Sequence, residues 1–211
     1  MINGIRHTDL YDPATYADKR VAIVGVGTIG SHLALTLARM SVPFTMYDPD
    51  TIEEHNLATQ AYTRRDIGAY KVDAIQRQCE AIGAEEGAVV AIAEEYRWRD
   101  ADGYDLIVSC VDSIDARRTI ADDLCTRLET PIIDGRVGAE QVEVYRYKNA
   151  VDWLADLPAQ ADTDPCGARF TAYTANLCAG LMANAVKREL LGQPHPARIL
   201  YDAHTSTFIK V

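Results

Sequence analysis

Residues 20–30 read RVAIVGVGTIG, and this stretch decides the fold. It opens with a short β-branched run of the kind found in buried parallel strands. Three glycines then lead into a segment whose apolar residues recur at the spacing of one helix face, namely Ile29, Leu33, Leu37 and Met40. A strand, a glycine turn and a helix in that order predict the first unit of a fold in which strands and helices alternate.

The three glycines of the turn are Gly25, Gly27 and Gly30. Glycine at such a turn lets backbone N–H groups approach a phosphate at the start of the helix. Asp48 ends the next expected strand, 18 residues after Gly30, and a carboxylate there accepts hydrogen bonds from ribose hydroxyls. The spacing predicts a nucleotide-binding site at these four residues. The alternative is a glycine turn that serves only to pack the helix on the sheet.

Strands and helices continue to alternate through the first part of the chain. Further strands are expected at 43–48, 89–93, 105–110 and 131–134, and helices at 71–82 and 114–128. The second part differs, with an antiparallel strand at 141–147, a long polar surface loop at 148–165, a buried helix at 171–191 and a closing hairpin at 199–202 and 207–211. We predict one α/β domain over residues 1–211, with an N-terminal arm at 1–19. Its Rossmann-like, mostly parallel sheet is flanked by helices and has a C-terminal antiparallel extension.

Composition narrows the class of protein. The 211 residues carry a formal net charge of −10, which disfavours nucleic acid and anionic membrane surfaces as partners. The N-terminus is polar and no apolar run approaches the ~20 residues that span a bilayer, so we expect a cytoplasmic protein. The cysteines are Cys79, Cys110, Cys125, Cys166 and Cys178. They form no C-x-x-C pair that would support a structural zinc site, and Cys110, Cys125 and Cys178 are expected in the core.

Polar residues further along the chain favour a triphosphate over a nicotinamide dinucleotide. Asn56 and Gln60 supply amides, and Lys71, at the start of an expected helix, can place a point charge on phosphate oxygens. The alternative for Lys71 is a solvated surface lysine. Asp112 follows the strand at 105–110, on the sheet edge where ligands bind. Its carboxylate can hold Mg²⁺ or cap the helix that starts nearby, and the two roles are compatible.

In this order the motifs resemble those of the ThiF/MoeB/HesA family, which is related to the ubiquitin-activating enzymes. That family carries a glycine loop, D-x-D, S-N-L-x-R-Q, a D-I-G-x-x-K-like segment and C-x-D-N. Here they read GVGTIG at 25–30, DPD at 48–50, HNLATQ at 55–60, DIGAYK at 66–71 and CVDS at 110–113. Pro165-Cys166 and YDAHT at 201–205 are similar to the family's closing segment. The resemblance covers residues 20–211.

The resemblance implies an adenylyltransferase that uses ATP and Mg²⁺ to join AMP to a carboxylate and releases pyrophosphate. The implied binding residues are, besides the three glycines, Asp48 at the ribose, Asn56, Gln60 and Lys71 at the phosphates and Asp112 at Mg²⁺. Lys71 and Asp112 are also the implied catalytic residues. Members of the family are usually dimers and activate the C-terminal glycine of a ubiquitin-like β-grasp protein, so a homodimer and such a partner are expected here. The segment 148–165 would be the crossover loop that covers the partner's tail.

Two positions leave the activity open. The arginine of N-L-x-R-Q is Thr59, so one phosphate-binding cation is missing, with Arg64 or Arg65 as a substitute. Cys166 matches a cysteine that some relatives use catalytically, to form a thioester or an acyl disulfide. Its place before a helix favours the thiolate, and a structural or incidental role is the alternative.

Three other functions stay open. A non-catalytic ThiF-like subunit or pseudo-enzyme would bind nucleotide without turnover, which Thr59 would suit. Adenylation of a peptide or a tRNA-base carboxylate would keep the chemistry and change the substrate, although the acidic charge disfavours tRNA. A small NAD-dependent oxidoreductase would need a catalytic Tyr-x-x-x-Lys arrangement, which the sequence does not have in a credible place.

Overall fold

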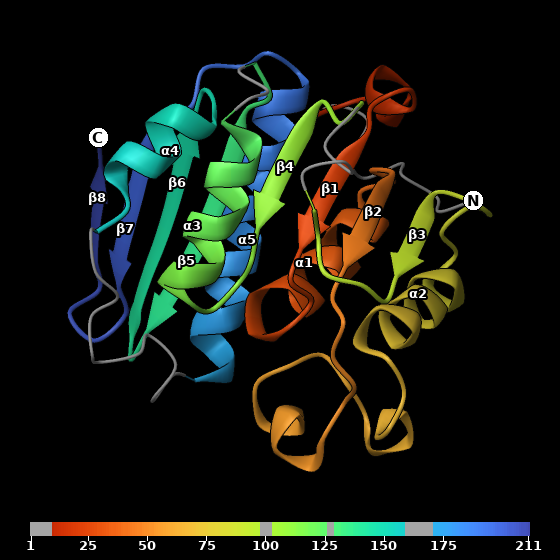
Figure 1. The fold of residues 1–211 in the computed structure, drawn as a ribbon. Helices are drawn as coiled ribbons and strands as arrows, with labels where there is room; N and C mark the ends of the chain where they lie inside the picture. The colour runs from red at the N-terminus through yellow and green to blue at the C-terminus, as the bar shows by residue number, and fades with distance from the viewer. Residues whose placement is uncertain (1–9, 98–102, 126–128, 159–170) are drawn as a thin grey trace.

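The computed structural model describes residues 10–97, 103–125, 129–158 and 171–211, and an eight-stranded sheet runs through them (Figure 1). In spatial order the strands are β3-β2-β1-β4-β5-β6-β7-β8. Their bounds are β1 Val21–Val24, β2 Phe44–Tyr47, β3 Val89–Ile92, β4 Leu106–Ser109, β5 Ile132–Gly138, β6 Gln141–Tyr147, β7 Arg198–Asp202 and β8 Thr207–Lys210. Strands β3, β2, β1, β4 and β5 are parallel to one another, and β6, β7 and β8 each run antiparallel to the strand before them. This arrangement confirms the predicted fold class.

Helices cover both faces of the sheet (Figure 1). On one face lie α1 Thr28–Arg39, α2 Lys71–Ile82 and α5 Ala172–Leu190, and on the other α3 Ile114–Leu124 and α4 Ala150–Asp156. Short 3₁₀ helices are η1 Pro13–Tyr16, η2 Glu54–Ala58 and η3 Arg64–Asp66. In β1, Val21 and Ile23 belong to one core and Ala22 and Val24 to the other. Because both faces are buried, the strand shows no polar alternation.

The order of the strands reverses between β1 and β4. From β1 the chain adds β2 and β3 on one side and then returns to add β4 on the other. The registers bring Val24 level with both Tyr47 and Ser109, so these strands end at one edge. Open α/β sheets bind ligands at such a reversal, beyond the carboxyl ends of the strands.

Local sequence signals set the ends of several elements. Helix α2 has the predicted bounds, because Gly83 adopts a left-handed φ of 102° and its N–H donates to carbonyls of the last turn. The predicted closing hairpin is confirmed as β7 and β8. Among the described residues no helix combines the length and apolarity that a membrane span requires.

Two predictions are wrong. The segment 148–165 is not a surface loop throughout, because α4 forms within it. Asn149 caps this helix by accepting from the Asp152 N–H at 2.9 Å, and Trp153 is fully buried against the sheet. Residues 159–165 lie outside the described residues. Cys125, expected in the core, is only partly buried, because it follows the last turn of α3.

A buried ionic cluster joins α3 and α4 to the sheet at Asp134. The Asp134 carboxylate is inaccessible to solvent and accepts from Arg117 Nε at 2.9 Å, Arg136 Nε at 2.8 Å and Trp153 Nε1 at 3.2 Å. Arg117 is buried too, and its Nη2 donates to the Gly135 carbonyl at 3.0 Å. Charge-assisted bonds of this kind offset the loss of hydration of the buried charges. The cluster therefore fixes β5, α3 and α4 relative to one another.

We predict that Asp134→Ala lowers the free energy of unfolding by about 3–5 kcal/mol, because it leaves the buried Arg117 guanidinium without its counter-ion. Equilibrium unfolding in urea measures the loss. Glu54→Ala is the matched control, since the Glu54 carboxylate is 80% exposed and lies 3.9 Å from Arg64 Nη2. It should change the free energy by less than about 0.5 kcal/mol. Equal losses in the two variants would contradict the structural role of the cluster.

Candidate functional site

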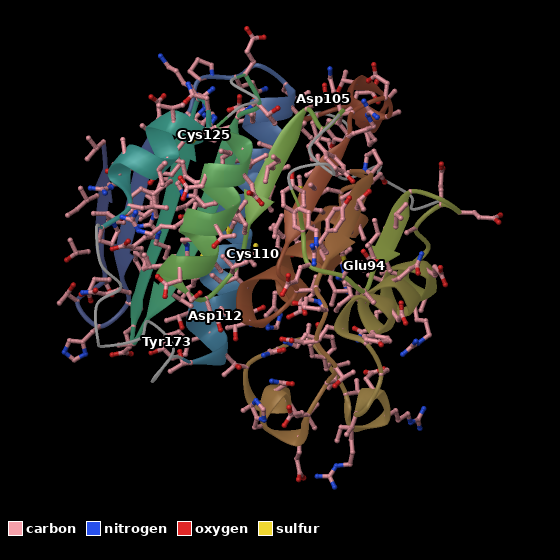
Figure 2. The ribbon with its side chains drawn as sticks, in the orientation of Figure 1. Glu94, Asp105, Cys110, Asp112, Cys125 and Tyr173 are labelled. Carbon is pink, nitrogen blue, oxygen red and sulfur yellow. The ribbon has the colours of Figure 1, made fainter. Side chains whose placement is uncertain are left out.

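A cavity of about 530 Å³ lies at the edge of the sheet where the strand order reverses. Its walls come from the turn after β1, the end of β2, the start of α2 and the segment between β4 and α3. Figure 2 labels Cys110 and Asp112, which enter the wall directly after β4. The predicted site residues on this wall are Gly25, Gly27, Asp48, Gln60, Lys71 and Asp112.

The glycine turn is shaped by close packing at two positions and by open space at the third. Gly25 has a φ of 88°, and a Cβ on it would lie 3.0 Å from the Cys110 carbonyl carbon. A Cβ on Gly30 would overlap the Gly25 carbonyl oxygen. Around Gly27 the nearest atom to a Cβ, Gln60 Nε2, would be 4.0 Å away. Gly27 is also the N-cap of α1 and offers no capping side chain, so the first N–H groups of the helix are available to an anion.

Asp48 is fixed at the end of β2 by two backbone groups. Its Oδ2 accepts from the Val26 N–H at 2.7 Å and its Oδ1 from the Asp50 N–H at 2.9 Å. Burial raises the pKa of this carboxyl above its ordinary value, and the Lys71 charge and the two N–H donors oppose that shift. The carboxylate therefore lines the cavity in a set orientation, as the ribose prediction requires.

Lys71 is not a solvated surface lysine. It is the first residue of α2 and only 8% exposed. Its Nζ lies 2.6 Å from Asp50 Oδ2 and 4.0 Å from Asp48 Oδ1. The ammonium is therefore held on the cavity wall among carboxylates, where it can contact an anionic ligand.

The two predicted amides are separated in the structure. Gln60 lines the cavity, and its Oε1 is buried without a hydrogen-bond partner among the described residues. A ligand or water that donates there would satisfy it. Asn56 lies off the main wall, in a smaller cavity of about 190 Å³ that also contacts Lys71. Its Oδ1 accepts from the Glu53 N–H at 2.8 Å in the capping box of η2, so its observed contact is structural.

Asp112 does not cap α3. Ser113 is the N-cap, and its Oγ accepts from the Ala116 N–H at 3.0 Å. The Asp112 side chain is exposed on the cavity wall. The described residues contain no group of three His, Cys, Asp or Glu side chains that could hold a metal ion. A single carboxylate suits Mg²⁺, which usually binds proteins through one or two carboxylates, water and phosphate oxygens.

Thr59, in the position of the missing arginine, lies beside α1. Its carbonyl oxygen is 3.0 Å from His32 Nε2, and its Oγ1 is 3.5 Å from Thr28 Oγ1. Among the described residues that line the cavity there is neither Arg64 nor Arg65. Lys71 is the one cation on that described wall.

Cys166 lies outside the described residues, so its role stays a prediction. Burial raises the pKa of the Cys79, Cys110 and Cys178 thiols, which makes these groups poor nucleophiles at neutral pH. Cys125 lies at the end of α3 opposite to Asp112 (Figure 2). None of these four described cysteines combines a reactive thiol with a place beside Asp112.

Sequence reasoning missed the wall formed after β3. Glu95 and Tyr96 line the cavity, and the Tyr96 ring meets the Tyr47 ring edge-on with 5.1 Å between centroids. A signal for them existed, because both closely follow the strand expected at 89–93. Residues just past a parallel strand belong to the ligand-binding edge.

Known proteins resemble this chain in sequence. Over 122 residues, 49% of the chain, it is 30% identical to Ubiquitin-like modifier-activating enzyme 5 of Drosophila mojavensis and covers 30% of that protein. Over 65 residues, 28% of the chain, it is 35% identical to the ATP-dependent ubiquitin transferase-like protein Cap2 of Vibrio cholerae and covers 11% of that protein. The chain thus spans less than a third of the length of these curated relatives.

Solved structures share the fold. PaaA has a TM-score of 0.76 at 20% identity, and E. coli MccB with ATP has a TM-score of 0.74 at 20% identity. Each comparison covers 94% of this chain and 65% of the solved chain. The ThiF family model matches residues 11–210, nearly the whole sequence. The chain therefore belongs to the ThiF family.

Proposed function

We propose that this chain binds ATP with Mg²⁺ in the cavity and joins AMP to a carboxylate, with release of pyrophosphate. The observation that carries the proposal is the convergence of three groups on one cavity at the strand reversal. These groups are an uncapped helix N-terminus, a fixed carboxylate and a buried lysine. Membership of the ThiF family supports the same class of reaction.

Different groups on the cavity wall would bind the ribose and the phosphates of the nucleotide. Asp48 keeps free lone pairs beside its two backbone bonds, and these would accept from ribose hydroxyls. The first N–H groups of α1 and the Lys71 ammonium would bind phosphate oxygens. The Gln60 amide would add a contact, since its Oε1 has no partner among the described residues.

The excess of carboxylates on the cavity wall is the reason that a metal ion would be needed to bind a triphosphate. Its described wall carries the carboxylates of Asp48, Asp50, Glu95 and Asp112 against the single cation of Lys71. A triphosphate on its own would meet net repulsion there. Asp112, which is exposed on the wall, would hold Mg²⁺, and the ion would neutralise phosphate charge.

The proposed reaction needs position and charge more than proton transfer. A carboxylate oxygen of the substrate attacks the α-phosphorus, a P–O bond forms, and the bond to pyrophosphate breaks. The attacking carboxylate is already ionised at neutral pH, so no protein base is required. Asp48 would fix the ribose, and Lys71 would stabilise negative charge on the phosphate oxygens.

For the substrate we propose the C-terminal glycine of a ubiquitin-like β-grasp protein, because two relatives are named for ubiquitin-related activities. The part of the segment 148–165 that follows α4 would cover that tail, and the chain would act as a homodimer in the cytoplasm. The Cys166 thiolate would then attack the acyl carbon of the adenylate, which forms a thioester and releases AMP. One observation, Thr59 in place of the family arginine, favours a second candidate, a nucleotide-binding subunit without turnover.

ATP–pyrophosphate exchange tests the proposed reaction. With Mg²⁺ and candidate β-grasp proteins, we expect exchange that depends on the C-terminal glycine of one partner. We expect it to fall by at least about 100-fold in Lys71→Ala and in Asp112→Ala, because each removes a charge on which the transition state depends.

Asp115→Ala is the matched control for Asp112→Ala, since Asp115 is an exposed carboxylate of the same helix start and is not among the described lining residues. It should keep the exchange rate. Exchange that survives both cavity variants would contradict the site. ATP binding without exchange, with every partner tried, would favour the non-catalytic subunit.

The glycine turn supplies a second pair of variants. Gly27→Ala should leave the free energy of unfolding nearly unchanged but weaken ATP binding by about tenfold, because its Cβ enters the open space before α1. Gly30→Ala should lower the free energy of unfolding by about 2–3 kcal/mol, because its Cβ meets the Gly25 carbonyl. Urea unfolding and calorimetric titration with ATP measure the two effects. A Gly27→Ala variant that binds ATP normally would place the phosphates elsewhere.

Cys166→Ser separates the two chemical steps. We expect it to abolish an adduct with the partner protein that added thiol cleaves, seen on denaturing gels, while the rate of pyrophosphate exchange stays within about twofold. Cys125→Ser, which changes a partly buried thiol at the far end of α3, should keep both. A partner adduct that persists in Cys166→Ser would assign the acyl transfer to another group.

A further inference from the structure

Lys71 lies beside a second carboxylate, that of Asp50, which has no role in the proposed reaction. Its Nζ lies 2.6 Å from Asp50 Oδ2, whereas Asp48 Oδ1 is 4.0 Å away. A distance of 2.6 Å is short even for a charge-assisted hydrogen bond. In this structure the direct counter-ion of Lys71 is therefore Asp50.

The two carboxylates differ in how firmly they are held. Asp48 accepts from two backbone N–H groups and is almost entirely buried, so it cannot turn away without breaking both bonds. The Asp50 side chain is 64% exposed, and Lys71 is the partner found for its carboxylate among the described residues. Asp50 can therefore turn toward the solvent without losing another side-chain partner, but the buried Lys71 ammonium then needs a new anionic partner.

Only the side chain of Asp50 is free to turn in this way. Its N–H donates to Asp48 Oδ1 at 2.9 Å, and its carbonyl accepts from the Lys71 N–H at 2.9 Å. The Lys71 side chain is 9% exposed and begins at the first residue of α2. A rotation of the Asp50 side chain would thus uncover the ammonium and leave both backbones in place.

We propose that Asp50 is an exchangeable counter-ion, which neutralises Lys71 until a phosphate group of the ligand takes its place. The inference rests on the proposed nucleotide-binding function. A carboxylate and a phosphate at one ammonium repel each other, so phosphate binding turns the Asp50 carboxylate outward. Asp50 is then a positioning residue that competes with phosphate for Lys71 and sets the affinity for phosphate-bearing ligands.

Competition predicts a selective gain in affinity. Asp50→Asn removes the charge and keeps the size and the backbone bonds of the residue. We expect ATP and inorganic tripolyphosphate to bind about fivefold more tightly, because no carboxylate at position 50 then competes for the Lys71 ammonium. Adenosine should bind with unchanged affinity, because it carries no phosphate. Isothermal titration calorimetry with and without Mg²⁺ gives the dissociation constants.

Two comparisons isolate the contact with Lys71. In a Lys71→Ala background, Asp50→Asn should leave the tripolyphosphate affinity nearly unchanged, because no ammonium remains to compete for. Glu54→Gln removes another exposed carboxylate of the 51–70 segment, one that lies beside Arg64, and should have no effect. Urea unfolding of each variant checks that the fold is kept.

Several results would overturn the proposal. One is that Asp50→Asn binds ATP and tripolyphosphate no more tightly than the unaltered chain. Another is that Asp50→Asn gives the same gain in affinity in the Lys71→Ala background, which would indicate general electrostatic repulsion. Weakening that occurs only with Mg²⁺ would assign Asp50 to the metal and overturn the proposal as well. If the unaltered chain binds tripolyphosphate but neither adenosine nor ATP, the proposed function fails while the tripolyphosphate comparison still decides the role of Asp50.

Discussion

The contact between two backbone turns, at Gly25 and at Cys110, is the constraint on which the site depends. A Cβ on Gly25 would lie 3.0 Å from the Cys110 carbonyl carbon, so no side chain fits between the turns. They end β1 and β4, the strands between which the order reverses. Because the two backbones touch, α1 and α3 begin on the walls of one cavity. Gly27 and Asp112, which are distant in sequence, therefore line the same cavity.

The same turn is held by hydrogen bonds from the end of β2 and from the segment between β2 and α2. Asp48 accepts from the Val26 N–H, and Tyr62 donates its hydroxyl to the Val26 carbonyl. Both polar groups of one turn residue are thus satisfied by side chains from other parts of the chain. Asp48 therefore orders the turn and lines the cavity with one carboxylate. The hydrogen bond that fixes the glycine turn therefore also orients the Asp48 carboxylate on the cavity wall.

The sequence predicted those parts of the site that depend on neighbours close in the chain. The glycine spacing, Asp48 at a strand end and Lys71 at a helix start are local signals, and Gly25, Gly27, Asp48 and Lys71 lie on one wall. Asn56 lies off that wall and caps its own 3₁₀ helix, and residue type alone does not distinguish such an amide from one that binds a ligand. Helix α4 and the Asp134 cluster were missed for another reason. The burial of Trp153 in a polar segment depends on a carboxylate 19 residues away, which no periodicity reveals.

The distribution of charge limits how this cavity can bind a polyanion. On its described wall Lys71 is the one cation, and Asp50 neutralises it. Thr59 offers no charge where the family pattern has an arginine. The start of α1 adds only about half an elementary charge. The remaining attraction must come from a divalent cation or from groups beyond the described residues. If the cavity binds ATP as proposed, we expect its affinity to depend more on Mg²⁺ than that of a site that keeps the arginine.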